Sequence, residues 1–177
     1  MQNPELFIHL AEIAGVFVGF GALIAVRSGG ASGRLEVGYT RGMVTYGLLT
    51  IVAGLAPVTL GFFDLAEHQV WALSSVLVMV GFVLMIVAMA RTPEYRANIV
   101  AGVEATRTPR RGMLAMAEGA LFGLYMLAMM LIPLVILLGV APDLEAGLYF
   151  ALVALILFGA AWALLILVFA QRLPESA

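Results

Sequence analysis

Five long apolar stretches constrain the fold of this chain more than any other feature. They cover residues 6–26, 43–63, 71–90, 113–140 and 148–170, and charged or turn residues bound each of them. A helix that crosses a bilayer needs roughly 20 residues, because it rises about 1.5 Å per residue through a hydrocarbon core of about 30 Å. The sequence therefore predicts an all-α integral membrane protein, with residues 1–177 forming one membrane domain of five transmembrane helices.

The composition agrees with this class and excludes several kinds of chemistry. Hydrophobic residues make up 63% of the chain and charged residues 11%, whereas a soluble domain has about 25% charged residues. Without cysteine the chain forms no disulfide, thiolate metal site or catalytic thiol. No hydrolase, P-loop or dinucleotide motif is present, and no basic surface with interleaved aromatic residues suggests nucleic acid. We therefore expect neither an enzyme nor a nucleic-acid-binding protein.

The nine basic residues, all arginines, predict the orientation of the helices. They fall after the first apolar stretch, after the third stretch and in the C-terminal tail: Arg27, Arg34, Arg41, Arg91, Arg96, Arg107, Arg110, Arg111 and Arg172. Five spans put all three segments on one side, which the positive-inside rule makes cytoplasmic. We expect the N-terminus outside and the C-terminus in the cytoplasm. Because arginine replaces lysine throughout and Ala, Gly and Leu abound, we expect the cytoplasmic (inner) membrane of a GC-rich bacterium.

Two further patterns concern the organisation of the chain. Residues 92–107, between the third and fourth spans, have apolar side chains every four residues between arginines, which predicts an amphipathic cytoplasmic helix. The segments 64–73 (DLAEHQVWAL) and 143–152 (DLEAGLYFAL) match at four of ten positions, and Arg-Gly-Met opens both the second and the fourth spans. These matches suggest a tandem duplication of a two-helix hairpin, although apolar sequences also produce such matches by chance.

Glu12 and Glu118 lie within the first and fourth spans. Glu12 follows Leu6 by six residues, which puts it about 9 Å from the outer side, and Glu118 lies about 9 Å from the inner side. A charged group costs about 2.5 kcal/mol or more at the centre of a membrane helix. The two carboxylates are either stations on a cation or proton path or independent acids. Small residues follow each of them and predict close helix packing and homo-oligomerisation: Gly15 and Gly19, and Gly119 and Gly123.

Other polar and aromatic residues are expected at the outer side of the membrane. Four acids of the two short turns form an expected outer acidic rim, which would concentrate cations at a pore mouth: Asp64, Glu67, Asp143 and Glu145. Avoidance of arginine on that side explains the same residues without a pore. His9, Glu12 and His68 are candidate ligands of a bound metal ion, since imidazole and carboxylate groups suit transition metals. Trp71 and Tyr149 are expected in the aromatic belt at the outer interface.

The sequence leaves two functions open. The first is an oligomeric cation channel or proton-linked transporter, an ion-transport protein whose path includes Glu12, Glu118 and His9. The second is a non-catalytic accessory or scaffold subunit that docks another membrane protein or anionic lipid. Neither function requires a cofactor, and the lipid bilayer is a partner in both.

Overall fold

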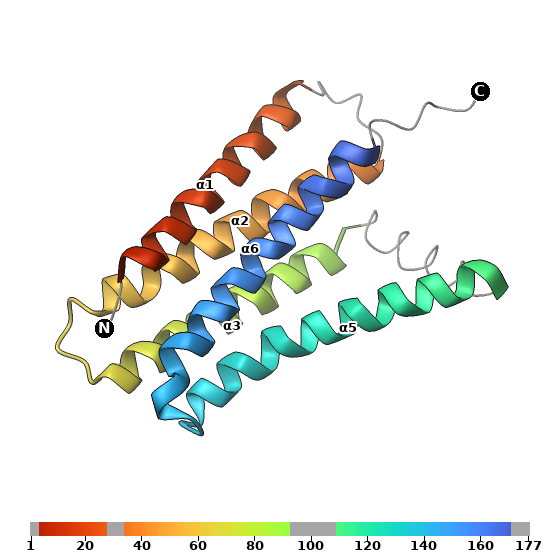
Figure 1. Ribbon diagram of the computed structural model, residues 1–177. Coiled ribbons are helices and arrows are strands. Elements are labelled where there is room, and N and C mark those ends of the chain that lie inside the picture. Colours follow the sequence, from red (N-terminus) through yellow and green to blue (C-terminus); the bar gives the residue numbers. More distant parts are fainter. Residues whose placement is uncertain (1–3, 28–33, 93–108, 171–177) are drawn as a thin grey trace.

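The part of the chain that the structure describes forms five long helices that lie side by side. The computed structural model describes residues 4–27, 34–92 and 109–170, which contain no strand (Figure 1). The helices are α1 (Pro4–Arg27), α2 (Arg34–Leu60), α3 (Glu67–Ala90), α5 (Pro109–Leu137), the short 3₁₀ helix η1 (Pro142–Leu144) and α6 (Glu145–Ala170). All five long helices have the length and apolar character of membrane spans. The prediction of an all-α protein with five spanning helices is confirmed at that level.

Several finer expectations about the fold stay predictions. The orientation of the helices and the tandem duplication are not tested by the arrangement of the helices. The amphipathic helix expected over residues 92–107 lies outside the described residues, apart from Thr92 at its start.

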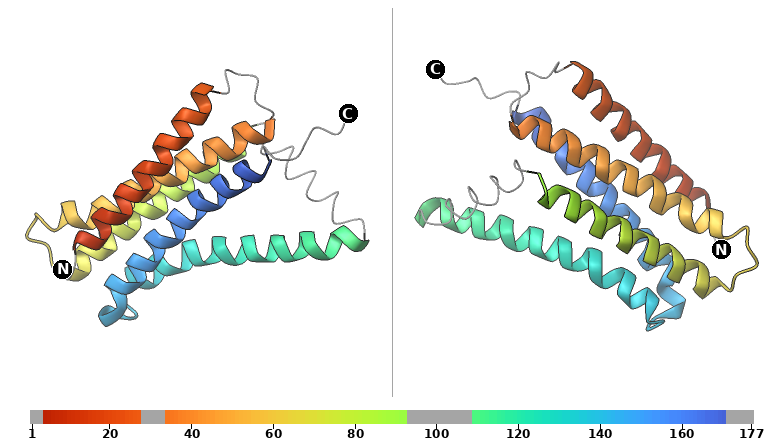
Figure 2. Two further views of the ribbon diagram at one scale, coloured as in Figure 1. Left: turned by 45° about the horizontal axis from the view of Figure 1, so that its top comes forward. Right: turned by 180° about the vertical axis from the view of Figure 1, so that it is seen from behind.

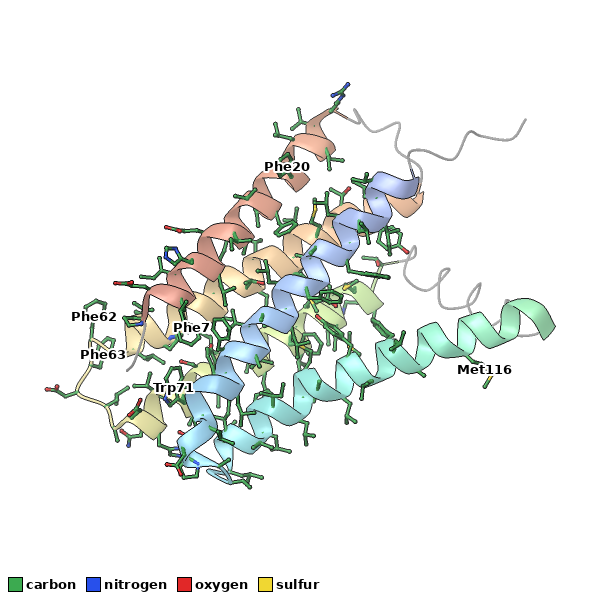
Figure 3. The ribbon with its side chains drawn as sticks, in the orientation of Figure 1. Phe7, Phe20, Phe62, Phe63, Trp71 and Met116 are labelled. Atoms are coloured by element: carbon green, nitrogen blue, oxygen red, sulfur yellow. The ribbon has the colours of Figure 1, made fainter. Side chains whose placement is uncertain are left out.

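The helices are longer than the apolar stretches at several ends. Helix α2 begins at Arg34 rather than at residue 43, because backbone hydrogen bonding continues beyond the apolar segment. It ends at Leu60 rather than at residue 63. Just after this end, the Gly61 N–H donates to the Pro57 carbonyl oxygen at 3.0 Å. Phe62 and Phe63 then lie in the exposed turn before α3 (Figure 3).

Helices α2 and α6 hold the bundle together. Helix α2 contacts α1, α3 and α6, and α6 also contacts α1 and α5. Helix α5 packs against α3 and α6 near its Leu137 end and diverges from the other helices toward Pro109, as two views show (Figure 2). The exposed side chains of Met116, Leu121 and Leu124 agree with this divergence.

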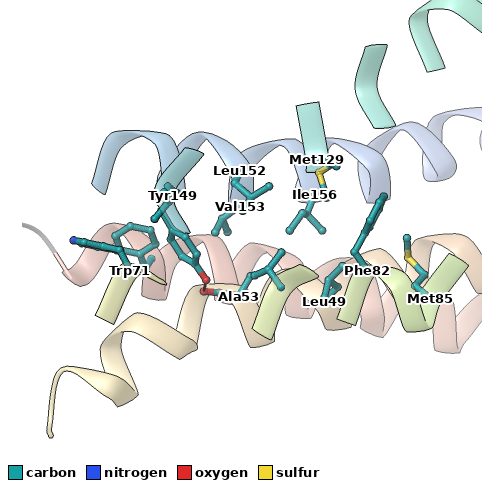
Figure 4. Packing of buried hydrophobic residues seen from close by; sticks show 13 residues of the cluster. Leu49, Ala53, Trp71, Phe82, Met85, Met129, Tyr149, Leu152, Val153 and Ile156 are labelled. Atoms are coloured by element: carbon teal, nitrogen blue, oxygen red, sulfur yellow. Dashed lines mark hydrogen bonds between the residues drawn. The ribbon is translucent and has the colours of Figure 1, made fainter. Parts of the chain in front are cut away.

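The centre of the bundle is a continuous cluster of buried side chains from all five helices (Figure 4). Phe7 of α1 lies against the rings of Trp71 and Tyr149, with centroids 5.8 and 5.9 Å away, and its ring also meets Phe150 edge-on at 5.8 Å. Trp71 is 2% exposed and Tyr149 is fully buried. The expectation of an interfacial aromatic belt at these two positions was wrong, because their rings fill the junction of α1, α3 and α6.

Helices α1 and α2 approach each other closely at glycines of α2. A Cβ atom at Gly54 would lie 2.7 Å from the Phe7 carbonyl oxygen, and one at Gly47 would lie 3.3 Å from the Ala14 carbonyl oxygen. On α1, Gly21 lies against the side chains of Met43 and Val44. Small residues allow such contact between membrane helices, whose association depends on close packing.

Candidate functional site

The outward face of α1 carries a pair of ionisable side chains. The Nδ1 atom of His9 lies 3.0 Å from Oε2 of Glu12, one helical turn further along. The two side chains are 66% and 67% exposed, so they point away from the bundle. The sequence prediction that these two residues belong together is consistent with this contact. Their outward direction could not be read from the sequence, because nothing in it says which face of α1 meets the other helices.

The contacts between α1 and α2 show which part of the apolar segment of α2 lies beside Glu12. The two helices are antiparallel, with Phe7 level with Gly54 and Ala14 level with Gly47. Glu12 is therefore level with Leu49. That residue lies at the middle of the apolar segment Val37–Leu60 and about 17 Å from its Leu60 end. Measured along α2, Glu12 therefore lies about 17 Å from the end of the apolar segment. The spacing within α1 alone gives a smaller depth of about 9 Å.

Two glycines lie on the same outward face of α1 as Glu12. A Cβ atom added at Gly15 or Gly19 would meet nothing within 4 Å. Val16 and Leu23, which are 58% and 67% exposed, border them. Within the chain these glycines therefore make no close helix contact, and the packing predicted for them requires a second polypeptide. We call the surface formed by His9, Glu12, Gly15 and Gly19 the outer face of α1.

The second histidine belongs to a separate contact. Nδ1 of His68, in the first turn of α3, lies 2.7 Å from Oε1 of Glu145, in the first turn of α6. The Glu145 side chain is 4% exposed and that of His68 is 48% exposed. Gly139 follows the end of α5 and has a left-handed φ of 60°. It lies next to the imidazole ring of His68. The contact therefore joins the ends of three helices on the side of the two short turns.

This arrangement separates the residues that were expected to bind a metal ion. His9 and Glu12 lie together, but His68 is paired with Glu145 instead. Among the described residues, no group of three or more His, Cys, Asp or Glu side chains could hold a metal ion. The predicted set of His9, Glu12 and His68 is thus not assembled within one chain, because the ring of His68 is held at the α3–α6 contact.

The expected outer acidic rim is divided in the same way. Asp64, Glu67 and Asp143 are exposed at the end of the bundle where the two short turns lie. Glu145 is buried beneath His68 and has no exposed carboxylate to offer an ion at a rim. Three of the four acids are therefore exposed at this end of the bundle, and the fourth is buried.

The predicted site in the fourth span lies in the diverging part of α5. Glu118 belongs to this helix, but its side chain is outside the described residues. Gly119 and Gly123 follow it, and a Cβ atom at either would meet nothing within 4 Å. Like Gly15 and Gly19, these glycines make no close contact within the chain. The structure does not bring Glu118 together with the outer face of α1, because helices α1 and α5 share no substantial contact.

The interior of the bundle offers few free polar groups. The Tyr149 hydroxyl donates to the Ala53 carbonyl oxygen at 2.8 Å, and the Tyr125 hydroxyl donates to the Leu155 carbonyl oxygen at 3.2 Å. The Thr50 hydroxyl donates to the Tyr46 carbonyl oxygen of its own helix. These hydroxyls link or satisfy helix backbones. In the described part of the chain, side chains therefore fill the centre of the bundle.

The sequence did not single out two features of this interior. Ser74 and Ser75 are fully buried in α3, one turn below Trp71, and Phe7 anchors α1 to α3 and α6. A serine pair in an apolar stretch is a visible signal, since buried hydroxyls in membrane helices usually mark packed faces. The role of Phe7 has no comparable signal, because an apolar residue at the end of an apolar helix is ordinary.

Comparisons of the chain with models of protein families, with curated proteins and with solved structures found no match.

Proposed function

We propose that this protein is a non-enzymatic ion-transport protein of the bacterial cytoplasmic membrane that acts as an oligomer. In this proposal the outer faces of α1 from neighbouring copies meet, and Glu12 provides the carboxylate of a cation or proton path between them. The N-terminus lies outside, the arginines lie in the cytoplasm, and the exposed acids of the short turns form the outer mouth. Glu118 would act nearer the cytoplasmic side.

The observation that carries this proposal is the exposure of Glu12 near the middle of its span, with His9 beside it one turn nearer the end. A carboxylate facing lipid at this depth is costly, whereas the same group facing a hydrated seam or a partner is stabilised. Gly15 and Gly19 lie directly below it without a neighbour, and such small residues let helix backbones approach. The outer face of α1 therefore has both a reason to be covered and a surface suited to a second helix.

The packed interior supports a path between chains rather than through one chain. The described core is filled by large side chains such as Trp71, Phe82 and Ile156, and its tyrosine hydroxyls are bonded to backbone oxygens. A path for ions needs polar or hydrated groups in sequence across the membrane. The outer face of α1 has two such groups, His9 and Glu12, and both are exposed.

Ion and proton flux into liposomes containing the purified protein tests this function. Glu12→Gln should abolish the flux without changing the oligomer, because the amide keeps the shape but not the charge. Glu5→Gln is the matched control, since Glu5 lies on the same side of α1 two turns toward the N-terminus and is exposed. Flux that Glu12→Gln leaves intact, or no flux above empty vesicles over a range of pH, cations and voltage, would refute the proposal.

The oligomer is tested separately with substitutions that the single chain tolerates. Gly19→Leu should dissociate the oligomer in detergent, because the side chain meets nothing in its own chain but would enter the interface. Ala151→Leu, at an exposed position of α6, should leave the oligomer intact. Light scattering of the solubilised protein gives the mass of each variant.

The second candidate is an accessory subunit. The packed interior favours it because the described part of the single chain has no open path of its own for an ion. In this case the outer face of α1 meets a different membrane protein, and Glu12 pairs with a residue of that protein. The purified chain would then conduct nothing. One stoichiometric partner would co-purify with the wild type and be lost on Gly19→Leu substitution.

A further inference from the structure

A cavity of about 440 Å³ opens at the arginine-bearing end of the bundle, away from the outer face of α1. Its walls come from the last turns of α1 and α3 and from the first half of α2. Pockets of about 300–1,000 Å³ are the usual size of sites for small ligands. The residues that line it are Val18, Gly21, Ala22, Thr40, Arg41, Val44, Thr45, Ala88, Met89 and Thr92.

The walls of this cavity are apolar and its charged group is at the edge. Val18, Val44 and Met89 provide aliphatic surface, and the small side chains of Ala22 and Ala88 leave the space open. Arg41 is exposed, as expected for a guanidinium at the mouth rather than at the bottom. The cavity thus combines a hydrocarbon-lined interior with one cation, which is the complement of an anionic amphiphile.

Two of the three threonine hydroxyls in the wall are already bonded to backbone oxygens, and Arg41 is the one cation among the lining residues. The Thr45 hydroxyl donates to the Arg41 carbonyl oxygen and the Thr92 hydroxyl donates to the Met89 carbonyl oxygen, each at 2.7 Å. Their protons are therefore already used within their own helices. A free inorganic anion would gain little from the apolar walls, whereas a phospholipid would place its acyl chain against them.

The position of the cavity puts it within reach of membrane lipid. Arg27 at the end of α1 and Arg91 at the end of α3 lie at the same end of the bundle as Arg41. Arginines at this level attract anionic headgroups, with a contribution of about 1 kcal/mol for each basic residue near the surface. The three helices that form the cavity are each long and apolar enough to cross a membrane, so their sides would meet acyl chains below this level.

We propose that this cavity is a binding site for an anionic phospholipid, whose phosphate is held by Arg41 and whose acyl chain lies between α1 and α3 on α2. The site is independent of the proposed ion path, because none of its residues belongs to the outer face of α1. The ligand class is a glycerophospholipid with a net negative headgroup, such as phosphatidylglycerol.

Native mass spectrometry of the purified full chain with phosphatidylglycerol and phosphatidylcholine of equal acyl length tests the site. We expect the wild type to retain phosphatidylglycerol preferentially and Arg41→Gln to reduce this retention by about fivefold. Arg41→Lys should restore most of the preference. Arg27→Gln, which removes an arginine at the same end but outside the cavity, should have less than half of the effect of Arg41→Gln.

A second pair of variants tests the cavity rather than the charge. Ala88→Leu fills the space between the walls and should reduce retention of both lipids, whereas Ala151→Leu adds the same group to an exposed site on α6 and should not. Circular dichroism checks that each variant is folded.

Several outcomes would overturn the proposal. Equal retention of the two lipids by the wild type would show that the cavity does not select an anionic headgroup. Equal losses in Arg27→Gln and Arg41→Gln would indicate diffuse attraction to the arginine-bearing end. Full retention in Ala88→Leu would place the lipid elsewhere. A second copy or another polypeptide that dissociates only in Ala88→Leu would show that protein, not lipid, occupies the cavity.

Discussion

Nδ1 of His68 lies 2.7 Å from Oε1 of Glu145, which joins the first turn of α3 to the first turn of α6. The two residues are far apart in the sequence, and the carboxylate is almost fully buried. The chain contains a second contact of the same chemistry, between His9 and Glu12, in which both side chains are exposed. Since both pairs join a histidine to a glutamate, comparing them tests how burial changes the contribution of such a pair to stability.

Replacing His68 should destabilise the protein more than replacing His9. His68→Ala leaves a buried carboxylate without its partner, which costs about 1–3 kcal/mol. His9→Ala removes a contact on the outward face of α1, where neither side chain packs against another helix of the chain, so unfolding of the dissociated chain should change less. The midpoint of thermal unfolding in detergent, followed by circular dichroism, measures both. Equal shifts for the two variants would contradict the structural role of the His68–Glu145 contact.

Glycines of the chain should differ sharply in their tolerance of a methyl group. Gly54→Ala places a Cβ atom 2.7 Å from the Phe7 carbonyl oxygen, so the backbones of α1 and α2 must separate. Overpacking of this kind costs about 1–3 kcal/mol. Gly15→Ala meets nothing in its own chain and should leave the unfolding midpoint of the dissociated chain unchanged or slightly raised, because alanine favours the helix. Unfolding in denaturing detergent compares them, and a loss of stability in Gly15→Ala alone would refute the α1–α2 packing.

Two phenylalanines on α1 provide a test of how this helix is anchored. Phe7 is 3% exposed and lies in the aromatic junction, whereas Phe20 is 51% exposed (Figure 3). Phe7→Ala should cost about 3–5 kcal/mol, as truncation of a buried aromatic side chain does. Phe20→Ala should cost far less. If the two variants unfold at the same temperature, α1 is not held by the junction.

The two tryptophans should respond differently to quenching by brominated lipid. Trp71 is 2% exposed and Trp162 is 54% exposed, so only Trp162 offers its ring to acyl chains. In Trp71→Phe the fluorescence comes from Trp162 and should fall strongly in brominated bilayers. In Trp162→Phe it comes from Trp71 and should fall little. Strong quenching of Trp71 would show that the α3–α6 junction is open to lipid.

The apolar stretches predicted the number and approximate position of the spanning helices because length and hydropathy depend only on local sequence. Helix ends were predicted less well, as at Arg34, where helical hydrogen bonding continues beyond the apolar residues. Trp71 and Tyr149 were assigned to the interface because aromatic rings often lie there, but their burial depends on Phe7, which comes from another helix. Such a contact cannot be inferred from the spacing of residues within one span.

The same limit applies to the candidate site. An acid in a membrane span identified Glu12 as unusual, and its spacing from His9 predicted their proximity. The glycine pattern of α1 suggested packing, yet the glycines that contact α1 within the chain are Gly47 and Gly54 of α2. A small residue permits close approach, but which partner uses it depends on the rotation of each helix about its axis.

The aromatic junction has a consequence for the order in which the protein assembles during its synthesis. Phe7 leaves the ribosome well before its ring partners Tyr149 and Phe150, which lie more than 140 residues later in the chain. At a synthesis rate of about 5–20 residues per second, these partners are made roughly 7–30 s after Phe7. The hairpin of α1 and α2 can form early through its glycine contacts, but its open end stays unfilled until α6 enters the bilayer. The nascent chain therefore carries an exposed aromatic surface until α6 is made, and the arrival of α6 fills the junction.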